Sequence, residues 1–179
     1  MKKSTFNVAF GGMISALCIV LMFSVSFLPI MLYVFPMLCS ILMGILLETS
    51  GQKTAWSAFA AVSMFSLLLC SEKEAVMFYV GFFGFYPMVR VHLEKIKSKA
   101  LVLISKIALF NLSVVLIYVF LISIFGLASV GLEEGTSAWL LFAMLAVGNV
   151  IFLMYDKVII IYVKLIGKKI VSRMRFKNK

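Results

Sequence analysis

The chain has 179 residues, of which 64% are apolar and only 13% are charged. Soluble domains contain about 45–50% apolar and about 25% charged residues, so a water-soluble fold of this length would leave a large apolar surface uncovered. Glycine, proline and cysteine are too few for a collagen-like chain or a disulfide scaffold, and the hydropathy excludes a disordered one. The composition therefore predicts an integral membrane protein.

Apolar stretches recur along the chain, separated by short polar segments. An α-helix needs about 20 mostly apolar residues to cross a bilayer. Six stretches approach that length: 8–28, 30–47, 54–70, 75–91, 100–125 and 138–161. They lack the alternation of a membrane β-barrel, so we predict an all-α, polytopic transmembrane helix bundle with six spans. We expect residues 1–163 to form this domain. The remaining 164–179 are expected to form a basic cytoplasmic tail, with cations at the spacing of a helix lying on the membrane surface.

Basic residues are distributed very unevenly between the two sides of such a bundle. All but two of the 17 Lys and Arg residues fall on one side; Lys73 lies on the other, and Lys106 lies inside the fifth stretch. The positive-inside rule then predicts that both termini are cytoplasmic, in a multi-pass protein of the cell membrane. The net charge of +10 is also typical of nucleic-acid binders. Here, however, the cations line the membrane margin, where they fix topology and contact anionic membrane lipid, so no nucleic-acid partner is expected.

Two opposite charges occur inside the apolar stretches. Lys106 lies about six residues into the fifth stretch, roughly 9 Å at 1.5 Å per residue, and Asp156 lies at a comparable depth in the sixth. Ionisable groups in a bilayer are costly, so matching depth predicts an intramembrane ion pair. The alternative is that Lys106 extends to the interface while Asp156 pairs with Lys157 or with water. Both interpretations remain open.

Two asparagines, Asn111 and Asn149, fall near the centre of the fifth and sixth stretches. A side-chain amide in hydrocarbon needs a hydrogen-bonding partner. Asn149 precedes Asp156 by seven residues, which places the two on one helix face. The amides are interpreted either as packing between these two spans or as the polar wall of a substrate pocket.

The fourth stretch carries an aromatic series. Tyr79, Phe83, Tyr86 and Arg90 follow a 4-3-4 spacing, which predicts one helix stripe ending in a cation, with glycines and a proline interspersed. The stripe is interpreted either as aromatic core or as the lining of a cavity for a flat ligand. The candidate ligand-binding residues are accordingly Tyr79, Phe83, Tyr86, Asn111 and Asn149.

Catalytic and metal-binding patterns are not found in the sequence. His92 is the single histidine, and the three cysteines lie singly in apolar stretches. There is no glycine-rich phosphate-binding motif. An intramembrane enzyme would need at least two reactive side chains that point to one place, and Lys106 and Asp156 are the only candidates in the sequence. We therefore expect no enzyme activity, no catalytic residues, no metal and no cofactor.

The first stretch contains a pair of small residues, Gly12 and Ala16, at the spacing that lets another helix approach closely. That helix is expected either in this chain or in a partner. With six spans in under 200 residues, the chain resembles the S components of energy-coupling factor transporters. The docking motif of that family is Ala-xxx-Ala, which Gly12-Met13-Ile14-Ser15-Ala16 matches with glycine in the first place. Pro29 and Pro36 occur where the family has its gating segment.

This resemblance implies a function. S components bind a vitamin or similar solute from outside and dock on a transmembrane coupling subunit driven by two ATPases. It implies that Gly12 and Ala16 carry partner docking and that this chain is a non-catalytic, solute-binding membrane subunit. The alternative hypothesis, from another class, is a membrane scaffold subunit of a cell-envelope assembly complex that has no ligand.

Overall fold

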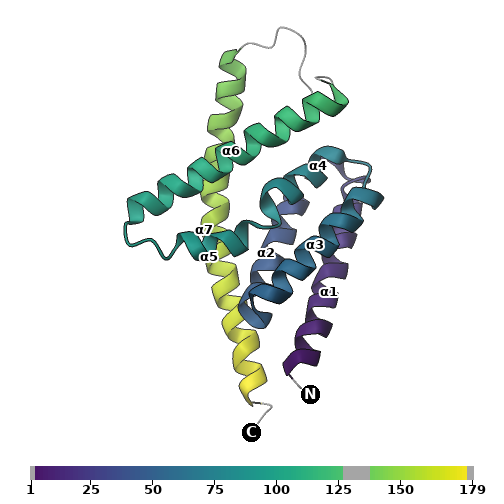
Figure 1. Cartoon of the computed structure of the whole chain (residues 1–179), viewed down its shortest axis with the longest axis vertical. Helices are drawn as coiled ribbons and strands as arrows, with labels where there is room; N and C mark the ends of the chain where they lie inside the picture. Colours follow the sequence, from purple (N-terminus) through teal and green to yellow (C-terminus); the bar gives the residue numbers. More distant parts are fainter. Residues whose placement is uncertain (1–2, 127–137, 177–179) are drawn as a thin grey trace.

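The computed structural model describes residues 3–126 and 138–176, and every regular element in these two ranges is helical (Figure 1). The all-α prediction is therefore confirmed for the described part of the chain. The elements, in chain order, are α1 (Lys3–Ser24), the short 3-10 helix η1 (Pro29–Met31), α2 (Val34–Ser50), α3 (Gln52–Leu69), α4 (Lys73–Phe78), the π-helix η2 (Tyr79–Phe83), α5 (Tyr86–Leu93), α6 (Lys99–Phe125) and α7 (Ala138–Phe176).

Helices α4, η2 and α5 follow one another without a long connection and together form one interrupted helix, which we call the broken segment. Counted in this way, the described residues contain six main helical segments: α1, α2, α3, the broken segment, α6 and α7. Four of the helical segments in the described ranges are long and apolar enough to cross a membrane: Thr5–Ser24, Lys73–Leu93, Lys99–Phe125 and Trp139–Val163. The apolar helix α2 is shorter, and α3 does not reach the same apolar content. The start of α1 and the end of α7 lie toward the same end of the molecule (Figure 1). The structure is therefore a helical assembly in which four elements are long and apolar enough to span a membrane.

Helices α1, α2 and α3 pack together around a cluster of buried apolar residues, which we call the first cluster. Its members are residues of α1, α2 and α3, together with the α4 end of the broken segment, and they include Cys18, Met22, Cys39, Met43 and Val62. Between α2 and α3 the chain reverses at Gly51, whose φ of 86° is a left-handed conformation that side chains other than glycine rarely adopt. Helix α3 can therefore begin directly after α2.

The second cluster is mainly aromatic and lies between the broken segment, α6 and α7. It contains Phe82, Tyr86, Phe110, Phe152 and Tyr155 together with aliphatic neighbours. The rings of Phe110 and Phe152 are stacked with centroids 4.7 Å apart, which joins α6 to α7 where the two helices cross. Helix α2 contacts both halves, since it packs against α1 and α3 and also against α5 and α7.

The broken segment lies between the two clusters and owes its shape to glycine and proline. The Gly84 N–H donates to the Tyr79 carbonyl over 2.7 Å, an i→i+5 bond that adds one residue to the turn. A Cβ on Gly84 would lie 2.5 Å from the Phe59 ring and 2.8 Å from the Tyr79 carbonyl oxygen, so only glycine fits. Pro87, with no N–H to donate, follows at the start of α5.

This wide turn overturns the prediction of a single aromatic stripe. Tyr79 belongs to the first cluster, whereas Phe83 and Tyr86 belong to the second. The 4-3-4 spacing assumes a uniform α-helix, and the additional residue in the π-turn changes the direction of everything that follows it. The stripe is thus divided between the two sides of the segment.

At the end of the chain, α7 continues without a break through position 164 to Phe176. The basic tail expected at 164–179 is helical over its described part, and it prolongs the last span. Its final residues, 177–179, lie outside the described ranges.

Candidate functional site

Lys106 and Asp156 meet between α6 and α7. The Lys106 Nζ lies 2.7 Å from the Asp156 Oδ2, and the two residues are only 4% and 9% exposed. The structure thus agrees with the ion pair, which is one of the two interpretations that the sequence left open. Lys106 is buried against Asp156, whereas the neighbouring Lys157 is exposed.

Two further charges complete a ring. Arg90 on α5 lies 3.4 Å from the Asp156 carboxylate and 2.7 Å from that of Glu94, which caps the end of the same helix. Lys106 Nζ in turn lies 3.5 Å from the Glu94 carboxylate. Each cation therefore contacts both anions and each anion contacts both cations. We call this arrangement the charge ring.

The charge ring is connected to the aromatic cluster through Tyr86. The Tyr86 hydroxyl donates a 2.5 Å hydrogen bond to Asp156 Oδ1, while Arg90 approaches the same oxygen. Asp156 therefore accepts from donors on α5 and α6. A carboxylate removed from water is tolerated only when paired and hydrogen-bonded in this way.

The ring is balanced, with two positive and two negative side chains in contact. Taking such charges out of water costs several kcal/mol per ion, which mutual attraction offsets only when the geometry is good. The arrangement joins α5, α6 and α7 to one another through charged side chains. Because each charged side chain in the ring contacts an oppositely charged one, we interpret the ring as a structural contact between helices.

Sequence reasoning missed Arg90 and Glu94 as parts of this site. In the sequence, Arg90 ends the predicted aromatic stripe and Glu94 lies beyond the fourth apolar stretch. Their i,i+4 spacing, which matches a helical ion pair, was the available signal.

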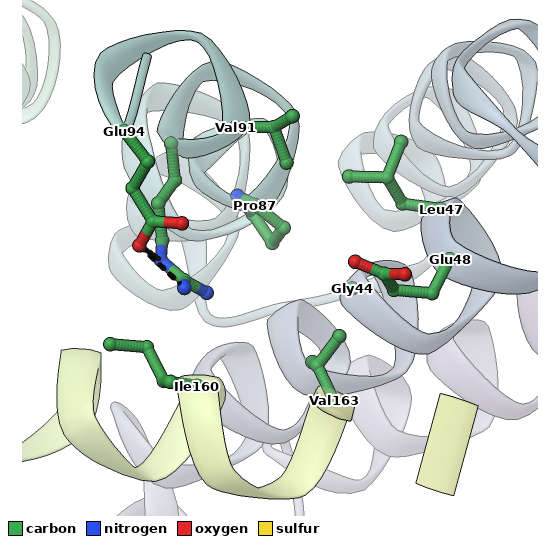
Figure 2. Close-up of a pocket in the computed structure, with 9 residues that line it drawn as sticks. Gly44, Leu47, Glu48, Pro87, Val91, Glu94, Ile160 and Val163 are labelled. Carbon is green, nitrogen blue, oxygen red and sulfur yellow. Dashed lines mark hydrogen bonds and ion pairs between the residues drawn. The ribbon is translucent and has the colours of Figure 1, made fainter. Parts of the chain in front are cut away.

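A small cavity adjoins the ring between α2, α5 and α7. Figure 2 shows the Glu48 carboxylate facing across it toward Pro87 and Glu94, with Ile160 and Val163 on the α7 side; Arg90 also lines the cavity. The cavity has a volume of about 40 Å³, enough for roughly one water molecule, whereas pockets for drug-sized ligands measure about 300–1,000 Å³. None of the five candidate ligand-binding residues lines it.

Those five residues occupy three separate places. Tyr79 is enclosed in the first cluster, and Phe83 and Tyr86 are enclosed in the second, all at most 3% exposed. Asn111 and Asn149 bond each other: each amide Nδ2 donates to the other's Oδ1, over 3.0 and 2.9 Å. Each amide also donates to the carbonyl four residues earlier in its own helix. These bonds agree with the packing interpretation, and the ligand-binding role of the five residues stays a prediction.

The small-residue pair of α1 lies on the outside of the bundle. Gly12 and Ala16 are both exposed, and a Cβ added to Gly12 would meet nothing within 4 Å. The neighbouring Gly11 is the glycine that packs inward, because its Cβ would lie 2.9 Å from Thr54 on α3. Within the described ranges, the face of α1 that carries Gly12 and Ala16 is therefore not used by another helix of this chain.

At the opposite end of the bundle, a carboxylate and two phenols join α4, α2 and α6. The Tyr33 and Tyr118 hydroxyls donate to Glu74 Oε1 over 2.6 and 3.3 Å. Tyr33 precedes the first residue of α2, and partial burial, followed by its bond to Glu74, raises the pKa of its phenol far above the usual range. Sequence reasoning missed this cluster, whose residues are more than 40 positions apart.

Comparisons of the chain with protein families, curated proteins and solved structures gave no match. The interpretation of its function therefore depends on the residues and geometry described above.

Proposed function

We propose that this chain is a non-catalytic subunit of the cell membrane that spans the bilayer six times with both termini in the cytoplasm. It binds a small, vitamin-like solute from outside and relies on a transmembrane coupling subunit and ATPases for energy. Four long apolar helices and the concentration of cations on one side support the membrane topology. The balanced charge ring supports a structural rather than a catalytic use of the buried ionisable groups.

The observation that carries the proposal is the exposed face of Gly12 and Ala16. Small residues in membrane helices permit close approach of another helix, and this face has no partner within the described chain. A subunit that must dock on another transmembrane protein needs such a face. The resemblance to S components assigns docking to these same two positions.

Affinity purification in mild detergent tests the docking face. We expect the unchanged chain to recover a transmembrane coupling subunit and ATPases, and Ala16→Leu to lose them. Ala108→Leu is the matched control, because Ala108 is also an exposed alanine within an apolar helix, on α6. If Ala16→Leu and Ala108→Leu recover equal amounts of the coupling subunit and ATPases, the face of Gly12 and Ala16 has no role in docking.

A thermal-shift screen of vitamins against the purified protein tests the solute. Stabilisation by one of them supports a binding subunit. No stabilisation, together with no ATPase among the co-purified chains, would contradict the proposal.

A scaffold subunit of a cell-envelope assembly complex is the second candidate. It is favoured by the tight packing of Tyr79, Phe83 and Tyr86 and by the mutual bonds of the two asparagines, which leave these side chains engaged within the protein. Recovery of envelope-synthesis proteins without a transporter module would support it.

A further inference from the structure

The acidic residues of the described chain are gathered at two places. Glu72 and Glu74 lie where the broken segment begins. Glu48, Glu94 and Asp156 lie at the charge ring and at the cavity beside it. Glu48 faces the cavity from α2 (Figure 2), but within the described ranges its carboxylate makes no ion pair and no hydrogen bond. Of the three acids at this place, Glu48 is therefore the one without a cation.

Glu48 is also placed unfavourably on its own helix. It lies in the last turn of α2, and the C-terminal end of a helix carries partial negative charge. Glu94 directly follows the last residue of α5 and so has the same disadvantage. A carboxylate at such an end is stabilised by a nearby cation. Both acids therefore gain from a contact with Arg90, which lines the cavity together with them.

The guanidinium of Arg90 has donors that the charge ring does not use. Its Nε and Nη2 donate to one oxygen of Glu94 over 2.9 and 2.7 Å, and Nε lies 3.4 Å from Asp156. Within the described part of the chain, no hydrogen bond involves Nη1 of Arg90. A guanidinium presents several N–H donors in one plane, so Arg90 is able to bind one more carboxylate.

The contact between Arg90 and Glu94 is held only weakly. The two residues are four positions apart on one helix, and the Glu94 side chain is 36% exposed. Pairs of this kind favour the contact by only about twofold over separated side chains. Lys106 also lies 3.5 Å from the Glu94 carboxylate, so Glu94 keeps a cation when Arg90 turns away. A change of partner by Arg90 therefore leaves no charge of the ring without a counter-charge.

We propose that Arg90 exchanges Glu94 for Glu48 across the cavity, while Asp156 remains its neighbour. Tightly packed side chains cannot change partners without moving those around them, but Arg90 lines an open volume of about 40 Å³. While Arg90 contacts Glu94, this volume suits a water molecule that bridges Glu48 to the ring. When Arg90 turns to Glu48, an ion pair forms between α5 and α2.

This exchange would create a charged link between the two halves of the bundle. Helix α2 packs against α5 and α7 through close apolar contacts: a Cβ on Gly44 would lie 2.7 Å from Val163 and 3.7 Å from Pro87. Within the described ranges, no ion pair joins α2 to the charge ring. The pair of Arg90 with Glu48 would be a link that opens and closes. It goes beyond the proposed function and does not depend on it.

The Nε–H signal of Arg90 in a nuclear magnetic resonance spectrum reports its partner directly. The chain has only three arginines, so this signal is assigned in detergent micelles by its loss in Arg90→Lys. We expect Glu48→Gln and Glu94→Gln to move the signal in opposite directions from its position in the unchanged chain. Each variant leaves Arg90 with a different one of its two partners, whereas the unchanged chain gives the average of both.

Glu72→Gln is the matched control, because it removes an acid at the start of the broken segment and should leave the Arg90 signal in place. A signal that does not respond to Glu48→Gln, or that moves in the same direction for both variants, would overturn the proposal.

Unfolding of the purified protein in detergent provides a second test. Glu48→Gln and Glu94→Gln each leave Arg90 one of the two partners, so each should raise the unfolding equilibrium constant by about twofold or less. The double variant leaves neither and should raise it by more than the product of the two single effects. An effect equal to that product, or single variants that are both more stable than the unchanged chain because the carboxylates only repel each other, would contradict the exchange. Neither measurement uses a ligand or a partner protein, so its failure is distinguishable from failure of the proposed function.

Discussion

The two halves of this molecule are held together by different means. Around the first cluster, helices approach through small and sulfur-containing side chains; Cys18 and Cys39, for example, each direct the Sγ toward the other's carbonyl at 3.9 and 3.5 Å. Around the second cluster, aromatic rings fill the space and strong polar groups pair across helices, as in the charge ring and the Asn111–Asn149 bonds.

The difference reflects what can drive helices together in lipid. Burial of apolar surface gives little advantage there, so close packing and interhelical polar bonds have to provide the stability. The α1–α3 half depends on shape, with Gly11 closely apposed to Thr54. The α5–α7 half depends on charge and hydrogen bonding. Substitutions that remove a charge should therefore affect the second half, and substitutions that add volume should affect the contacts that depend on close approach.

The largest effect is expected from Lys106→Met, which breaks the charge ring. The change leaves Asp156 buried at 9% exposure with Arg90 as its remaining cation. Removing one partner of a buried pair costs about 3–5 kcal/mol. Thermal unfolding of the purified protein in detergent should show this loss as a strongly lowered midpoint.

The control for this prediction is Lys157→Met, which removes an exposed lysine next to Asp156 and should leave the midpoint nearly unchanged. The double variant Lys106→Met/Asp156→Asn removes one cation and one anion together and should recover part of the loss. A double variant whose loss of stability equals the sum of the losses of Lys106→Met and Asp156→Asn would show that the two residues are not coupled.

A smaller effect is expected from Gly84→Ala, which tests close approach at the junction of the two halves. The added methyl would overlap the Phe59 ring of α3 and the Tyr79 carbonyl, and the latter is backbone that cannot rotate away. Overpacking of this kind costs about 1–3 kcal/mol, and the better helix propensity of alanine offsets about 1 kcal/mol of it at most. Thermal unfolding in detergent measures the difference.

Gly12→Ala is the matched variant, since it adds the same methyl where nothing lies within 4 Å. It should leave the unfolding midpoint unchanged or slightly raised. A loss as large as that of Gly84→Ala would contradict the assignment of Gly12 to the outer face of α1.

Some features of the two halves depend only on the length of an apolar stretch or on the depth of a residue within it, and these could be predicted from the sequence. Apolar stretches located the helices, and matching depth on the last two long helices made contact between Lys106 and Asp156, and packing through Asn111 and Asn149, interpretations that the structure agrees with. Both inferences depend only on a regular rise along straight helices.

The sequence did not predict the features that depend on helix rotation. The π-turn separates Tyr79 from Phe83 and Tyr86, and it brings Arg90 to Asp156; neither effect follows from regular helical periodicity. Similarly, Gly11 and Gly12 are neighbours in the sequence, and only the packing of α1 on α3 decides that Gly11 faces inward. The bonds of Glu74 to Tyr33 and Tyr118 join residues that are 41 and 44 positions apart, which no local pattern signals.

The smallest effect on stability is expected from Tyr33, whose hydroxyl donates to Glu74 at the end of the bundle remote from the termini. Removing this bond tests whether the two halves are also connected at that end. Tyr33→Phe removes the 2.6 Å bond to Glu74 but keeps the ring, which packs against Phe78. Because Tyr33 is 41% exposed, the bond should contribute about 1 kcal/mol or less. Tyr162→Phe is the control, since Tyr162 is 53% exposed.

This bond also predicts a dependence on alkaline pH. The pKa of Tyr33 is raised in the folded protein above the ordinary value of 10.0, so above that pH the unfolded chain loses a proton that the folded chain keeps. The contribution of Tyr33 to stability is therefore complete below about pH 10 and decreases as the pH rises further. Unfolding midpoints measured between neutral and alkaline pH should fall less steeply for Tyr33→Phe than for the unchanged chain. Parallel curves for the two proteins would mean that the Tyr33 phenol titrates normally and that the halves are not joined through Glu74.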